Sequence, residues 1–240
     1  KPAKIKMIHP DAYIDCLLEA DVIVDFKTRR EAVEKGIQQA AIKAKGKVLP
    51  DAQLLDIVTN LIEYPVPVIG RFDKAFLKLP DEILITSMRE HQKYFAVVDD
   101  NGKLLNHFVT VSNTRAKDMS VVARGNERVL RARLADARFF FDEDQKKSLE
   151  EHAEGLKSVV FQRKLGTSHD KMERFTKLSG KLAQKLCPDS MSTVERISHL
   201  CKADLVTSMV FEFPEIQGIV GREYALKAGE DEAVAKGIEE

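Results

Sequence analysis

The sequence lacks the features that define several protein classes. Lys plus Arg and Asp plus Glu number 38 each, so no overall charge attracts polyanions, and any contact with nucleic acid must come from a local patch. No apolar run is long enough to cross a membrane. The cysteines show neither paired nor metal-type spacing, which gives no disulfide framework and is typical of a reducing compartment; they are Cys16, Cys187 and Cys201.

Recognisable catalytic motifs are also missing. The chain has no Gly-rich phosphate loop, no Cys-x-x-Cys pair and no Ser-His-Asp set that sequence alone can justify. Nothing in it resembles an ATP-binding catalytic site. Its 240 residues, 44% of them hydrophobic, suffice for one large domain or two small ones. Because the chain begins at Lys1 and its last residues continue a helical pattern, we expect it to be part of a longer protein.

The first half predicts a mixture of helices and strands. A capping box at residues 28–31 predicts a helix that ends at Gly46, and a second helix is predicted from Asp51 to about Glu63. The sequence Asp-Asn-Gly at residues 100–102 predicts a hairpin turn. Short β-rich runs predict strands at residues 65–70, 82–88, 94–98 and 104–111.

After Ala116 the strand signals cease and every segment has helical periodicity. A second capping box at residues 192–195 predicts a helix that runs to about Phe211. The predicted fold class is therefore α+β and mostly helical. We expect an α/β module in residues 1–117 and an all-helical domain in residues 118–240.

One predicted helix, Gly125–Phe141, has two different faces. Its apolar face must be buried and consists of Leu130, Leu134, Ala137 and Phe141. The opposite face carries Arg128, Arg131 and Arg138, with Arg124 just before them. Such a row of planar donors is suited to successive phosphates. The alternative is a solvated face whose arginines pair with Glu127 or with acids elsewhere.

Two charged residues are predicted at apolar positions. Arg133 falls on the apolar side of the arginine-bearing helix, so we expect it to form a buried ion pair. Asp204 lies on the inward arc of the helix that is predicted to end at Phe211. We interpret Asp204 as structural, paired with an arginine such as Arg133 or Arg222, and not as a catalytic base.

The order of histidines and aspartates in the helical half is similar to the metal site of HD-type phosphohydrolases. His169 and Asp170 are adjacent, with His152 upstream and Asp204 downstream. A Gly-Thr-Ser string precedes the pair, so a helix start is the simpler explanation, with His169 exposed in its first turn. His152 lies among the acids of residues 150–154, so we expect it to be solvated. His199 falls on the opposite side of its helix from Asp204, so these two cannot share an ion. We predict no metal site.

The string His-Gln-Lys-Tyr-Phe at residues 91–95 lies between two predicted strands. Such a cluster, with Lys93 as its cation, could stack on or hydrogen-bond a nucleotide. It could equally be a turn from which Tyr94 and Phe95 enter the core. The sequence leaves both alternatives open.

Read together, four long strings closely resemble the β-subunit family of bacterial-type glycyl-tRNA synthetases, in the same order and over nearly the whole chain. The strings are residues 88–95 (MREHQKYF), 125–141 (GNERVLRARLADARFFF), 160–167 (VFQRKLGT) and 202–225 (KADLVTSMVFEFPEIQGIVGREYA). The resemblance implies a ligase of two α and two β subunits, or a fused αβ chain, and hence a dimeric or heterotetrameric parent. It also implies a location in the bacterial cytoplasm or in a chloroplast or mitochondrion.

The resemblance implies a division of labour. Glycine and ATP, with Mg²⁺, are activated on the α part, while the β part binds tRNA(Gly) and supports assembly. The matching region implies a module like the tRNA-editing-type module of phenylalanyl-tRNA synthetase, then an HD-like helical domain truncated at its C-terminus. Leu200-Cys201-Lys202-Ala203 stands where an active phosphohydrolase carries Leu-Leu-His-Asp, so we expect a fold that has lost its hydrolytic site.

The leading hypothesis is a tRNA-binding and assembly fragment without catalytic residues, metal ligands or a cofactor of its own. Its candidate tRNA-binding residues are Arg124, Arg128, Arg131, Arg138, Lys93 and Arg163. One rival is a metal-dependent phosphohydrolase that uses His169, Asp170 and Asp204. The other is a scaffold in which the basic row meets an acidic surface of the partner subunit.

Overall fold

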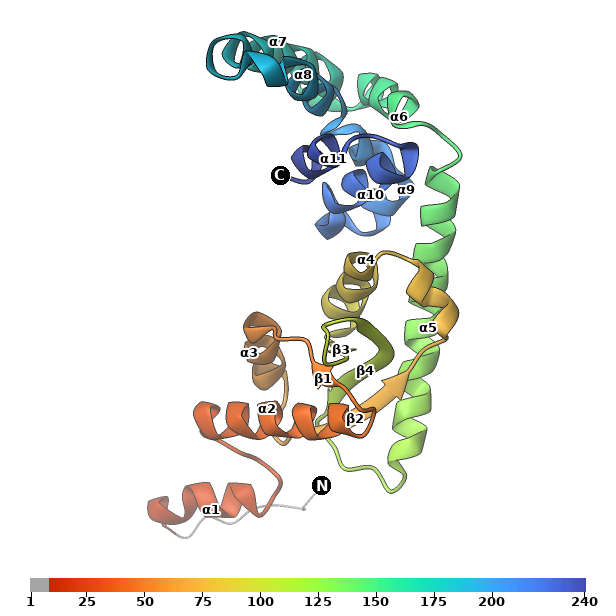
Figure 1. Cartoon of the computed structure of the whole chain (residues 1–240). Helices are drawn as coiled ribbons and strands as arrows, with labels where there is room; N and C mark the ends of the chain where they lie inside the picture. Colours follow the sequence, from red (N-terminus) through yellow and green to blue (C-terminus); the bar gives the residue numbers. More distant parts are fainter. Residues whose placement is uncertain (1–8) are drawn as a thin grey trace. The chain divides into compact units, whose positions relative to one another are not determined.

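The computed structural model describes residues 9–240 (Figure 1). The chain divides into two compact units, one ending at Leu134 and the other beginning at Ala135. This division falls inside one long helix, α5 (Met119–Asp144). The boundary predicted between residues 117 and 118 follows the end of the strand pattern and stays a prediction.

The first unit contains a four-stranded antiparallel sheet in the order β1-β3-β4-β2. Its central hairpin turns where the Asp-Asn-Gly motif predicts it. Asp99 Oδ1 accepts hydrogen bonds from the amides of Asn101 and Lys103, both at 2.9 Å, and Gly102 has a φ of 82°. The strands are β1 (Lys47–Val48), β2 (Val66–Arg71), β3 (Phe95–Val98) and β4 (Leu104–Ser112), and the last three confirm predicted strands.

Helices cover both faces of this sheet. α2 (Phe26–Ile42) and α3 (Ala52–Leu61) share one apolar core with Phe95, Val97 and Val109 of the central strands. On the other face the Tyr94 ring stacks on Phe108 with centroids 4.6 Å apart. The Tyr94 hydroxyl donates to Asn126 Oδ1 of α5 at 2.6 Å, which attaches the first half of α5 to the sheet. The remaining helical elements are η1 (Pro10–Ala12), α1 (Tyr13–Leu18), η2 (Lys74–Lys78), α4 (Asp81–Thr86) and η3 (Ser87–His91).

Two local predictions in this unit were wrong. Residues 82–88, predicted as a strand, belong to α4 and η3, and their buried residues recur at helical spacing: Ile83, Leu84, Ser87 and Met88. The β-branched residues Ile83, Ile85 and Thr86 favour a strand, but a helix buries the run on one side. Helix α2 begins at Phe26 because Asp25, not Thr28, is its N-cap, and Asp25 accepts the Thr28 amide at 2.6 Å.

The second unit is helical apart from one small hairpin, β5 (Val160–Gln162) with β6 (Gly166–Thr167). This hairpin departs from the prediction that only helices follow Ala116. The helices are α6 (Leu149–Gly155), α7 (Ser168–Leu186), α8 (Met191–Leu200), α9 (Ser208–Glu212), α10 (Ile219–Ala228) and α11 (Glu232–Glu239). Short 3₁₀ turns are η4 (Leu156–Ser158), η5 (Pro188–Ser190), η6 (Ala203–Val206) and η7 (Pro214–Ile216).

A buried carboxylate joins three helices of the second unit. Asp144, the last residue of α5, accepts the amides of Ser208 and Met209 at 2.8 Å each and the Tyr224 hydroxyl at 3.1 Å. It therefore caps the first turn of α9 and bonds to α10. No sequence pattern pointed to Asp144, because its partners lie 64 to 80 residues away.

The single helix predicted from residue 192 to Phe211 is three elements, α8, η6 and α9. α8 starts at Met191 after Ser190, whose side chain makes no capping bond, so the second capping box was wrong. Phe211 is 87% exposed and not on an inward arc. The break follows from tertiary contacts, since Asp144 and Thr207 together cap a new helix at Ser208. None of the helices within residues 9–240 has the length and apolar character of a membrane span.

Candidate nucleic-acid interface

The two faces of α5 lie as the sequence predicts. Leu130, Leu134, Ala137 and Phe141 are all buried. Arg124, Arg128, Arg131 and Arg138 are all exposed. The first three belong to the first unit and Arg138 to the part of α5 in the second unit. Because one turn of helix rises about 5.4 Å, Arg124, Arg128 and Arg131 follow one another at nearly one-turn intervals.

Glu127, which precedes Arg128 in the sequence, is bound elsewhere. Glu127 Oε1 accepts the Arg71 backbone amide of β2 at 3.0 Å, so this carboxylate faces the sheet. Arg124 donates to Ser120 Oγ at 2.9 Å, a contact that orients its guanidinium without removing its charge. Within residues 9–240, Arg128 and Arg131 make no hydrogen bond or ion pair. Their donors are therefore open to an external anion.

The backbone beside the row is also open. A Cβ atom built on Gly125 meets no atom within 4 Å. Glycine inside a helix costs about 0.5–1 kcal/mol relative to alanine, and packing within the described chain does not require it here. The missing side chain leaves the helix backbone between Arg124 and Arg128 uncovered.

The other candidate cations, Lys93 and Arg163, differ in exposure and in how far a neighbouring acid neutralises them. Lys93 has a φ of 55°, is half-buried, and places Nζ 3.5 Å from Glu90 Oε2, so its charge is partly neutralised. Tyr94 and Phe95 are buried, which confirms that this segment feeds the core. Arg163 is exposed on the β5–β6 hairpin of the second unit. We therefore regard Arg124, Arg128 and Arg131 as the best-placed candidates.

Arg133 is half-buried and not fully buried as predicted. Its neighbour on the helical wheel, Val129, is 47% exposed. The buried stripe of α5 is thus narrower than the wheel suggested, because only one side of this part of the helix packs on the first unit.

Asp204 is buried as predicted, with only 1% of its surface exposed. The predicted arginine partner was wrong: its hydrogen bonds come from backbone amides, including that of Gly218 at 2.5 Å. Arg222 pairs instead with Glu223 at 2.7 Å and Glu239 at 2.8 Å. Burial raises the pKa of Asp204, and the amides of Gly218 and Gly221 only partly oppose that effect.

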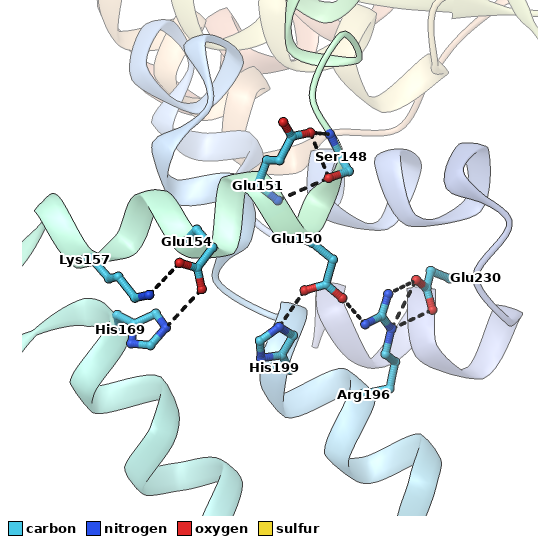
Figure 2. Close-up of polar contacts among 9 residues, drawn as sticks. All are labelled: Ser148, Glu150, Glu151, Glu154, Lys157, His169, Arg196, His199 and Glu230. Carbon is cyan, nitrogen blue, oxygen red and sulfur yellow. Dashed lines mark hydrogen bonds and ion pairs between the residues drawn. The ribbon is translucent and has the colours of Figure 1, made fainter.

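The histidines of the supposed metal site face different carboxylates of α6 (Figure 2). His199 Nε2 lies 2.6 Å from Glu150 Oε2, and His169 Nε2 lies 3.8 Å from Glu154 Oε1. Arg196 binds both Glu150 and Glu230, with its Nε 3.0 Å from Glu230 Oε2. Burial opposes ionisation of Glu150, but hydrogen bonds from Arg196 and His199 outweigh it and lower the pKa of this carboxyl.

Two of the predictions about these histidines were wrong. His152 is only 6% exposed, and its ring nitrogen lies 3.0 Å from the Asp144 carbonyl oxygen. The His169 side chain is mostly buried as well. The signal for His152 was present in the sequence, because Leu149, His152, Ala153 and Leu156 recur at helical spacing and all are buried.

The predicted helix start beside His169 and Asp170 is confirmed, because α7 begins at Ser168 with Thr167 as its N-cap. Thr167 Oγ1 accepts the Asp170 amide at 3.1 Å, while Asp170 Oδ2 accepts the Thr167 amide at 2.7 Å, so the two residues form a capping box. His152, His169, Asp170 and Asp204 thus each have a different partner within this unit. In the described part of the chain, no three His, Cys, Asp or Glu side chains converge where an ion could bind.

The described residues contain no assembled catalytic or metal centre, and the best candidate for a binding site is the exposed face of α5 that carries Arg124, Arg128 and Arg131. The model for the family described as "Glycyl-tRNA synthetase beta subunit" matches residues 1–240, and this chain belongs to that family. It is 59% identical over 219 residues to the glycine–tRNA ligase β subunit of Geobacter sp. (strain M21), covering 91% of this chain and 32% of that protein.

Two further relatives show the same coverage. The glycine–tRNA ligase β subunit of Trichlorobacter lovleyi is 57% identical over 228 residues, which are 95% of this chain and 33% of that protein. The corresponding subunit of Syntrophotalea carbinolica is 53% identical over 225 residues, covering 92% and 33%. The chain spans about a third of the length of these curated relatives.

Proposed function

We propose that this chain is the tRNA-binding and assembly portion of a glycyl-tRNA synthetase β subunit. The parent enzyme would attach glycine to tRNA(Gly) at the expense of ATP, with the chemistry on the α part. Family membership supports the parent activity. The observation that carries the RNA-binding role is the open arginine pair Arg128 and Arg131 beside Arg124 on α5.

The charge distribution explains how a neutral chain can bind a polyanion. Lys plus Arg equal Asp plus Glu overall, so affinity must come from a place where carboxylates are turned away. α5 provides such a place, since the Glu127 carboxylate accepts a backbone amide of β2 while Arg128 and Arg131 are exposed. Each phosphate contact would release counterions, which makes binding depend on salt. Arg138 and Arg163 of the second unit, and Lys93 of the first, are the secondary candidates.

The remaining features of the parent are inferred from the family. ATP and Mg²⁺ would be held by the α part, and the α subunit or α domain is the protein partner, in a dimeric or heterotetrameric enzyme. The three relatives above are bacterial, which favours the bacterial cytoplasm over an organelle.

We further infer that the helical unit keeps an HD-like fold without its hydrolytic site, and that the first unit is the editing-type module. In support, Lys202 and Ala203 replace the metal-binding pair, and Ala203 is fully buried at the start of η6.

A second role is a scaffold in which the same arginines meet an acidic protein surface. A double replacement, Arg128→Ala with Arg131→Ala, separates the two. If the row binds RNA, the variant binds a tRNA(Gly) transcript more weakly, and the slope of log affinity against log salt falls by about 0.7–0.9 for each phosphate that the variant no longer binds. Fluorescence anisotropy over a salt series measures both quantities.

The matched control is Lys27→Ala with Lys35→Ala, which removes two exposed charges from α2. This control should leave affinity and slope nearly unchanged. Equal behaviour of the wild-type chain and the arginine variant would refute RNA binding by the row and favour the scaffold.

A further inference from the structure

The β5–β6 hairpin exposes an aromatic ring among cations. Phe161 is 43% exposed, and all three residues of β5 are exposed, so this strand covers no core. The Lys171 ammonium of α7 lies 4.1 Å from the centre of the Phe161 ring. The ammonium therefore lies over one face of the ring, and the ring keeps exposed apolar surface next to positive charge.

Hydrogen bonds within the hairpin fix its turn. Gln162 Oε1 accepts the amides of Lys164 at 2.6 Å and Leu165 at 3.0 Å, which closes the turn. Gly166 adopts a φ of 86°, and the following Thr167 begins the capping box of α7. A preformed loop loses little conformational entropy on binding.

Three further cations belong to the hairpin and to the first turns of α7. Arg163 and Lys164 are exposed at the tip, and Arg174 Nη1 donates to the Leu165 carbonyl at 2.9 Å. This bond anchors the Arg174 guanidinium against the hairpin, and within residues 9–240 it is the only hydrogen bond that Arg174 makes. Asp170 is the nearby acid, and its carboxylate accepts the Thr167 amide and hydroxyl in the capping box while Arg174 helps to lower its pKa.

We propose that the β5–β6 hairpin and the first turns of α7 bind an unpaired nucleotide of RNA. A base would stack on Phe161, and neighbouring phosphates would contact Arg163, Lys164 and Arg174. Stacking on an aromatic side chain within a cationic surface is the general mode by which proteins hold single-stranded nucleic acid. This inference rests on the proposed RNA-binding function and adds a preference for unpaired nucleotides.

Two RNA probes test it with the whole chain. One is an RNA hairpin with a short unpaired 3′ extension, and the other is the same hairpin without the extension. We expect the extension to tighten binding about fivefold or more, since one stacked base contributes at least about 1 kcal/mol. Stacking releases no counterions, so the part of this ratio that comes from the stacked base should persist at high salt, while the part that comes from phosphates of the extension should fall.

The decisive variant is Phe161→Ala, which should lower the ratio at high salt to about one and leave binding of the blunt hairpin unchanged. Phe161→Tyr should keep the ratio. Phe211→Ala is the matched control, because Phe211 is an 87% exposed phenylalanine elsewhere in the same unit. Circular dichroism should show equal folding of all three variants, since neither ring is part of the core.

Other outcomes are equally informative. A ratio near one in the wild-type chain at high salt, or a high-salt ratio that survives in Phe161→Ala, overturns the inference but leaves the arginine row intact. Failure of the wild-type chain to bind either RNA overturns the proposed function itself. If Phe161→Ala leaves both RNA affinities unchanged but dissociates an oligomer in analytical ultracentrifugation, the hairpin is a protein contact and the inference is wrong.

Discussion

Replacing Asp144 should destabilise the second unit more than its place at the end of a helix suggests. The carboxylate accepts hydrogen bonds from Ser208, Met209 and Tyr224, and it is almost completely buried. In Asp144→Ala these three donors lose their acceptor. Ser208 is exposed and its amide can bind water, but Met209 and Tyr224 are buried.

The magnitude follows from the two stranded donors. An unsatisfied buried polar group costs about 1–3 kcal/mol, so we expect Asp144→Ala to lower the free energy of unfolding by about 2–6 kcal/mol. Asp144→Asn keeps one acceptor oxygen but turns an NH₂ group toward a second donor, so its loss should be smaller. Tyr224→Phe removes only one hydroxyl and should cost about 1 kcal/mol.

Urea unfolding followed by circular dichroism measures these differences. Asp142→Ala is the control, because Asp142 is an exposed acid on the same helix, and it should stay within about 0.5 kcal/mol of the wild-type chain. Combining Asp144→Asn with Tyr224→Phe should cost less than the sum of the single changes, since both remove the same bond. The reasoning fails if Asp144→Ala and Asp142→Ala are equally stable.

Two further predictions concern stability. Gly125→Ala should stabilise the chain by about 0.5–1 kcal/mol in urea unfolding, because the new methyl group meets open space and the helical propensity improves; a loss of stability would show that the glycine has a structural role. Burial raises the pKa of Asp204 above its ordinary value of 3.8, so the folded state holds this proton more tightly, and stability should fall as pH rises from about 4 through the folded-state pKa. In Asp204→Asn that part of the pH dependence should disappear from unfolding curves collected across this range, and an unchanged dependence would contradict the assignment.

Local patterns predicted several elements correctly. The amphipathic arrangement of α5 depends on one helix alone, so the buried Leu130 and exposed Arg128 could be assigned from spacing. The turn at residues 100–102 and the start of α3 beside Asp51 also depend on neighbouring residues alone, since Asp51 accepts the Leu54 amide at 2.8 Å as the N-cap. Where the partners are three or four residues apart, the sequence contains the whole interaction.

Two predictions failed because they followed the composition of a segment and not the spacing of its apolar residues. Residues 82–88 contain the β-branched Ile83, Ile85 and Thr86, which favour a strand. The segment is a helix because Ile83, Leu84 and Met88 are buried together on one side. His152 was assigned to the surface because acids surround it, although those acids lie on the other side of α6. In both segments the spacing of the apolar residues is a better guide than composition.

By itself, the sequence determined the family, the amphipathic α5 and the row of arginines, because these depend on the identity and spacing of nearby residues. Only the tertiary structure decided which charges remain available. The Glu127 carboxylate accepts a backbone amide of β2, and the Asp204 carboxylate accepts backbone amides in the core. His199 pairs with Glu150. The break before α9 likewise depends on Asp144, 64 residues away from Ser208. Contacts between distant segments have no local signature, since the energy of a charge depends on which groups the fold places around it.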